Sequence, residues 1–124
     1  MILLEIDQDG IVRLALRLPQ EEADEGRYLD ALRTIGELER PFALLVEIAG
    51  YRHLTREGEV AQAAWAKATR SHLNRMCRGL AILRENPDPR TLSSFQRFWS
   101  FPVQVTADRA GALAFLRGHL AAAG

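Results

Sequence analysis

The residues whose side chains are best suited to binding or modification form one short run, Thr55-Arg56-Glu57-Gly58. This run follows an apolar segment and precedes a helical pattern. A threonine hydroxyl in this place caps the first turn of a helix or accepts a phosphate from a kinase. A carboxylate there lies at the positive end of the helix dipole, where an anion is favoured. We therefore interpret Glu57 either as an ordinary first-turn residue or as a fixed negative charge in the place of a phosphate.

Other reactive side chains lack the spacing of a catalytic or metal site. His53, His72 and His119 are far apart in the sequence, and Cys77 is the single cysteine. The chain has no glycine-rich phosphate loop and no G-x-S-x-G motif. We therefore predict a protein that is not an enzyme and holds no metal or cofactor, with Cys77 as a buried structural residue.

Aromatic residues gather in the second half of the chain and follow helical spacing. This spacing is typical of a hydrophobic core, because aromatic residues on helices usually pack inward. The alternative is a pocket between helices, in which Trp65, Phe98 and Trp99 contact an apolar ligand.

The apolar periodicity predicts alternating strands and helices in the order ββαβαβαβα. Asp9-Gly10 indicates a hairpin turn, and the run from Ala43 to Ile48 is typical of a strand buried on both faces. One hairpin followed by βα crossovers predicts an α/β fold in one domain, 1–124, with a mixed sheet and the helices mainly on one face. The predicted strands are 2–6, 11–18, 43–48, 79–84 and a short one at Val103 and Val105; the helices are 21–38, 56–77, 90–99 and one that Asp108 caps.

Composition narrows the function classes. The 124 residues carry 16 basic and 16 acidic side chains, and this balance argues against a general nucleic-acid binder. No apolar run is long enough for a transmembrane helix, and Met1 opens directly into a short apolar strand without a basic flank. We therefore expect a cytoplasmic protein with no transmembrane segment.

The central stretch resembles the signature of STAS domains, the family of SpoIIAA-like anti-sigma factor antagonists. Glu47 takes the place of the acidic residue that ends the strand, Gly50 that of the glycine and Leu54 that of the apolar residue. Residues 55–58 stand where that family has Asp-Ser-Ser-Gly. The resemblance extends over nearly the whole chain and includes the segment 80–106, but the polar signature itself is not kept.

This resemblance implies a non-catalytic regulatory module that binds a protein partner. In the family the second serine of the signature accepts a phosphate from a partner kinase, and Glu57 stands in its place here. The implied partner is a regulatory kinase, an anti-sigma factor or an ATPase-like protein. Formation of a homodimer is a further alternative. The expected partner-binding residues are Tyr51, His53, Thr55, Arg56, Glu57 and Gly58.

The alternative function is the binding of lipid or another small apolar ligand. Some STAS-like proteins are grouped with lipid-transfer domains that resemble them in fold. A groove lined by Trp65, Phe98 and Trp99 would favour this alternative, whereas a flat polar surface around residues 51–58 would favour the interaction module.

Overall fold

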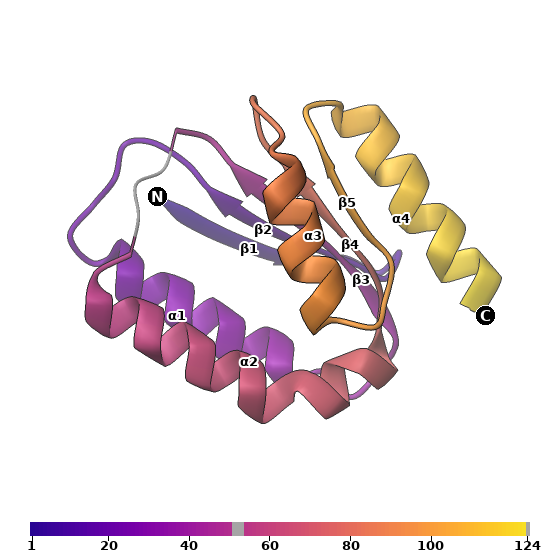
Figure 1. The fold of residues 1–124 in the computed structure, drawn as a ribbon, viewed down its shortest axis with the longest axis horizontal. Coiled ribbons are helices and arrows are strands. Elements are labelled where there is room, and N and C mark those ends of the chain that lie inside the picture. Colours follow the sequence, from indigo (N-terminus) through magenta and orange to yellow (C-terminus); the bar gives the residue numbers. More distant parts are fainter. Residues whose placement is uncertain (51–53, 124) are drawn as a thin grey trace.

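The computed structural model describes residues 1–50 and 54–123. Within these residues the chain forms an α/β fold with the predicted element order, ββαβαβαβα (Figure 1). Its elements are β1 (Ile2–Ile6), β2 (Ile11–Leu16), α1 (Asp24–Gly36), β3 (Phe42–Ile48), α2 (Arg56–Met76), β4 (Cys77–Leu83), α3 (Pro89–Phe98), β5 (Val103–Thr106) and α4 (Arg109–Ala123).

The strands form one mixed sheet in the order β1-β2-β3-β4-β5. β1 and β2 are antiparallel, and the following strands are parallel to their neighbours. The hairpin turns at Asp9-Gly10 as predicted: Gly10 has a positive φ of 88°, and Asp9 Oδ1 accepts a hydrogen bond from the Ile11 amide at 3.0 Å. A glycine suits this turn because a Cβ disfavours positive φ.

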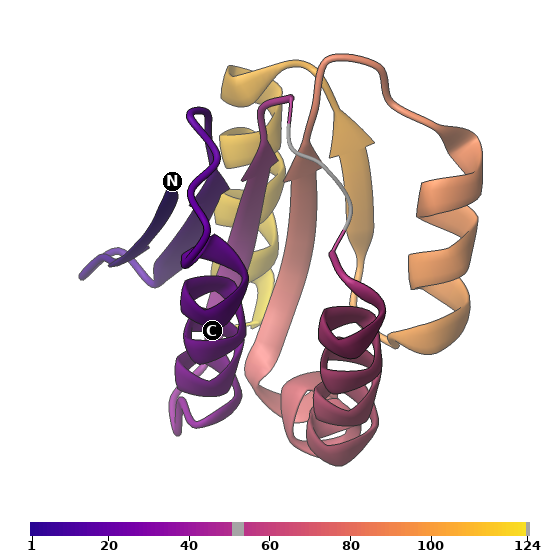
Figure 2. The ribbon, with the colours of Figure 1, turned by 90° about the vertical axis from the view of Figure 1, so that its left-hand side faces the viewer.

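The helices cover the two faces of the sheet unequally. Figure 2 shows α1, α2 and α3 on one face and α4 on the other, so the prediction of helices mainly on one face is confirmed. β3 is buried on both sides, because Phe42 belongs to the core beneath α1–α3 whereas Ala43 and Leu45 belong to the core beneath α4. This explains the continuous apolar run in its sequence.

Several element boundaries differ from the predictions by one to three residues. β2 ends at Leu16 instead of residue 18, and α1 begins at Asp24 instead of residue 21. The Asp24 side chain accepts a hydrogen bond from the Glu21 amide at 2.9 Å, which folds residues 21–23 into turns that precede the helix. β4 begins at Cys77, directly after α2, because this residue already pairs with Phe42 of β3. α3 begins and ends one residue earlier than predicted.

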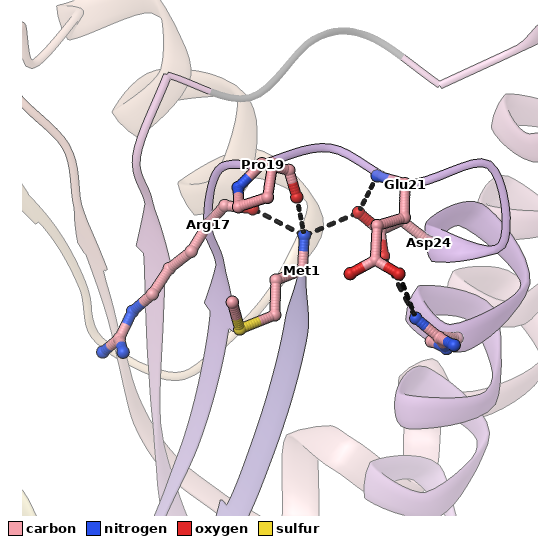
Figure 3. A network of polar contacts seen from close by, with 6 residues as sticks. Met1, Arg17, Pro19, Glu21 and Asp24 are labelled. Carbon is pink, nitrogen blue, oxygen red and sulfur yellow. Dashed lines mark hydrogen bonds and ion pairs between the residues drawn. The ribbon is translucent and has the colours of Figure 1, made fainter.

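A polar network joins the start of the chain to α1 (Figure 3). The ammonium group of Met1 donates hydrogen bonds to the carbonyl oxygens of Arg17 at 2.6 Å and Pro19 at 2.7 Å. It also forms an ion pair with Asp24 Oδ2 at 2.6 Å. Asp24 is only 1% exposed, so this charge is stabilised by its partners instead of by water. The network holds the edge hairpin against the first turn of α1.

Candidate functional site

The first turn of α2 is capped as the sequence predicts. Thr55 is the N-cap, and its Oγ1 accepts a hydrogen bond from the Gly58 amide at 3.1 Å. This bond satisfies one of the amides that a helix leaves unpaired at its start. The hydroxyl of Thr55 is thus engaged in holding the helix end.

A carboxylate from α1, which sequence analysis did not identify, anchors this helix start. Glu25 accepts a hydrogen bond from the Thr55 amide on Oε1 and one from the Thr55 hydroxyl on Oε2, both at 2.7 Å. Gly58 packs against the same carboxylate: a Cβ at residue 58 would lie 2.3 Å from Glu25 Oε1. Glycine at this place therefore has a steric reason, and Glu25 supplies negative charge at the positive end of the α2 dipole.

Arg56 and Glu57 are exposed in the first turn of α2, whereas Gly58 is buried. Tyr51 and His53, the other expected partner-binding residues, lie outside the described residues. The structure therefore brings Thr55 and Gly58 together around Glu25 and leaves the side chains of Arg56 and Glu57 in solvent. Negative charge at this helix end comes from Glu25 as well as from Glu57.

A cavity of about 220 Å³ lies between the sheet and the layer formed by α1, α2 and α3. Its walls come from β2, β3, β4 and the three helices, and they are almost entirely apolar. Trp65 of α2 and Trp99, which follows α3, both line it. These are two of the three residues expected to contact an apolar ligand.

The aromatic residues at one end of the cavity pack tightly on one another. Trp99 stacks on Phe101 with ring centroids 5.2 Å apart. Trp65 and Trp99 form an edge-to-face pair with ring centroids 6.4 Å apart. Trp99 and Phe101 are also buried in the core. The two alternatives for the aromatic cluster are thus compatible, because the same side chains form the core and the cavity wall.

Phe98 does not line this cavity. Its ring packs edge-on against Trp99 at 4.6 Å, and the guanidinium carbon of Arg70 lies 4.6 Å from the Phe98 ring centre. Phe98 therefore covers Trp99 from the outer side. The aromatic residue that α3 contributes to the cavity is Phe95, one helical turn earlier.

The hydroxyl and amide side chains of the cavity wall come from the early turns of the helices. The Tyr28 hydroxyl donates a hydrogen bond to Gln62 Oε1, and this bond connects α1 to α2. Burial raises the pKa of Tyr28 to about 12, so the hydroxyl stays protonated at neutral pH. Thr91, in the first turn of α3, lines the same cavity. Among residues 1–50 and 54–123, no charged side chain contributes to its wall.

Cys77 lies in the cavity wall, buried as the sequence predicts. Its thiol donates a hydrogen bond to the Gly79 carbonyl at 3.3 Å, and burial raises its pKa to about 12. The thiol is therefore protonated at neutral pH and behaves as a small apolar group.

An open cleft of about 870 Å³ lies at the carboxyl edge of the parallel strands. Glu47, at the end of β3, accepts hydrogen bonds from Arg109 at 2.6 Å and from Arg17 at 3.3 Å. Burial alone would raise the pKa of Glu47, but the hydrogen bonds and charges of Arg109 and Arg17 outweigh it and hold the pKa below its ordinary value. Ile48 lines both this cleft and the apolar cavity.

The described residues contain no group of three or more His, Cys, Asp or Glu side chains that could hold a metal ion. Across residues 1–50 and 54–123, no helix has the length and apolar character needed to cross a membrane.

Sequence analysis missed the residues whose roles depend on contacts between distant segments. Glu25 contacts Thr55 across 30 positions, and Tyr28 contacts Gln62 across 34. Their only local signals were an acidic residue near a helix start and an aromatic residue at helical spacing. Neither signal identifies the partner.

Comparisons with protein-family models, curated proteins and solved structures find no match to this chain.

Proposed function

We propose that this protein binds a small apolar ligand in the cavity between the sheet and α1–α3. The observation that carries the proposal is the cavity itself, about 220 Å³ with an almost entirely apolar wall. Protein interiors are normally close-packed, and an empty space of this size forfeits many van der Waals contacts. A ligand that fills it restores those contacts.

The volume sets the size of the ligand. An apolar cavity of about 150 Å³ in another protein stays dry and binds benzene. The cavity of about 220 Å³ is half as large again and suits a bicyclic aromatic or a medium-length alkyl chain. A two-chain phospholipid is too large to enter it whole.

The expected affinity follows from the apolar area that the ligand buries. Each buried methylene contributes about 0.8 kcal/mol, so an octyl chain gains roughly 6 kcal/mol and binds with a Kd on the order of 10–100 µM. Trp65 and Trp99 line the site, so binding should change tryptophan fluorescence directly.

The test is a titration with 1-octanol, followed by tryptophan fluorescence and by calorimetry. We expect saturable binding to the parent protein. Ala66 lines the cavity, so Ala66→Leu fills part of it and should weaken binding at least about tenfold through lost space and overpacking. Ala63→Leu makes the same change on the exposed side of α2 and should bind like the parent.

Two outcomes would overturn the proposal: no saturable binding to the parent, or equal binding by the Ala66 and Ala63 variants. In the second case 1-octanol would be bound outside the cavity. Circular dichroism and thermal unfolding of both variants establish that each is folded before the titration.

A second candidate is a STAS-type module that binds a regulatory protein through the start of α2. Its support is the exposed first turn with Arg56 and Glu57, which Glu25 and Thr55 hold in place. An exposed charged turn on a fixed helix end suits a charge-dependent contact with a protein partner. In this proposal Glu57 contributes the negative charge that a phosphate would supply in that family.

Glu57→Ser tests this second candidate. The variant should keep the fold, because an exposed contact with the helix dipole contributes only about 0.3–1 kcal/mol. It should lose partners that the parent recovers from the host lysate, whereas Glu57→Asp keeps the charge and should recover them. Equal recovery by the parent, Ser and Asp proteins would show that Glu57 is only a first-turn residue.

A further inference from the structure

We propose that the ligand is a single-chain amphiphile with an anionic head, whose tail fills the apolar cavity and whose head lies beside Arg84 in the carboxyl-edge cleft. This inference rests on the proposed function of the cavity. It adds the chemical class of the ligand and a residue that selects it.

The hydroxyl and amide side chains that line the cavity in the described part of the chain are all at one end. Tyr28, Gln62 and Thr91 come from the first two turns of α1, α2 and α3, and these helix starts lie toward the carboxyl ends of β3 and β4 (Figure 2). The other end is lined by apolar residues that include Phe42, Leu73 and Phe101. An amphiphile therefore fits in one direction, with its tail among the apolar residues and its head toward the carboxyl edge.

Ile48 borders both the cavity and the cleft at this edge. The residue ends β3, faces the core beneath α1–α3, and lines both spaces. A ligand whose tail lies against Ile48 inside the cavity can therefore place its head in the cleft. Among the described residues no charged side chain lines the cavity, so within this part of the chain the charge that recognises such a head comes from the cleft.

Arg84 is the cation best placed for this role. Leu80 and Ile82 of β4 face the cavity side of the sheet, and the alternation of a strand puts residue 84 on that same side. The backbone is still paired there, because the Arg84 amide donates to the Thr106 carbonyl at 2.9 Å. Arg84 itself lines the cleft.

The charges of the cleft favour an anion over a cation. Its lining includes Arg17, Arg84 and Arg109 together with Glu47 and Glu85. Arg17 and Arg109 are both paired with Glu47. Within the described part of the chain Arg84 forms no ion pair, so its guanidinium is available to a carboxylate or a phosphate.

The experiment compares ligands with the same tail and different heads: 1-octanol, octanoate, octyl phosphate and octyltrimethylammonium, each titrated by calorimetry at pH 7.5. Octanoate and octyl phosphate distinguish a carboxylate from a phosphate as the preferred anion. We expect at least one of these anions to bind the parent about fivefold or more tighter than 1-octanol, and the cation to bind more weakly than 1-octanol.

Arg84→Gln should reduce the preference for the anion to less than about twofold while 1-octanol binds as in the parent. Arg84→Lys should retain most of the preference. Arg75→Gln removes an exposed charge from the opposite end of α2 and should change nothing.

The outcomes separate the two proposals. If 1-octanol binds but no anion is preferred, or if Arg84→Gln keeps the preference, this inference is wrong and the apolar site stands. If none of the four ligands binds the parent, the proposed function is wrong, and this inference fails with it.

Discussion

Cys77 shows how burial alone decides the chemistry of a residue. Its thiol lies in the cavity wall, and burial raises its pKa to about 12. Because the thiolate is the reactive form, Ellman's reagent should label the native protein slowly and the urea-unfolded protein rapidly. In the proposed function, 1-octanol should slow the native reaction further. Native labelling as fast as that of the unfolded chain would contradict a buried thiol.

Glu25 is a second residue with a large structural effect, because its side chain fixes the position of the start of α2. Its two carboxylate oxygens hold the amide and the hydroxyl of Thr55, and Gly58 leaves room for them. The sequence marks Thr55 as a cap, and the folded chain adds a carboxylate from another helix to that cap.

Among the elements, α1 and α2 approach each other closely at Gly36. A Cβ at this residue would lie 2.9 Å from both Thr69 Cγ2 and Trp65 Nε1. Gly36→Ala should therefore destabilise the protein by about 1–3 kcal/mol through overpacking, although alanine is the better helix former. Urea unfolding measures the loss. Since Trp65 lines the cavity, its fluorescence should change as well.

Gly26 provides the matched control in the same helix. A Cβ there would meet nothing within 4 Å. Gly26→Ala should raise the free energy of unfolding by about 0.4–1 kcal/mol, because it restricts the unfolded chain without a clash. If both alanine variants change the free energy of unfolding in the same direction, the close packing at Gly36 does not determine the effect of Gly36→Ala.

At the scale of the whole molecule, segments distant in sequence meet at Asp24 (Figure 3). This carboxylate binds the Met1 ammonium group and the Glu21 amide, and the ammonium group also binds the segment after β2. Asp24→Asn should lower the free energy of unfolding by about 1–3 kcal/mol, because it removes the buried charge that pairs with the Met1 ammonium group. Urea unfolding measures this loss.

Asp30→Asn provides the comparison, because Asp30 forms an exposed pair with Arg33 in the same helix. An exposed pair of this kind contributes less than about 1 kcal/mol, so this variant should remain close to the parent. Equal losses in the two variants would show that the network at Asp24 does not stabilise the fold beyond an ordinary surface pair.

The order and type of the elements follow from local patterns in the sequence. Apolar periodicity separated strands from helices, Asp9-Gly10 marked the hairpin, and Thr55 marked a helix start that the structure confirms. These signals are local, because they depend on the backbone conformation and hydrogen bonds of a few consecutive residues. Boundaries were wrong where a side chain such as Asp24 reaches the backbone of a neighbouring turn.

The location of the candidate site depends on how the helices pack on the sheet. The sequence placed Trp65 and Trp99 on the inner sides of their elements, but it could not show that three helices leave a cavity above the sheet. Nor could it show that Phe95 instead of Phe98 lines that cavity, or that Ile48 borders both the cavity and the cleft of Arg84. Cavities arise from the packing of whole elements against one another, and side chains 30 or more positions apart carry no local signal of their contact.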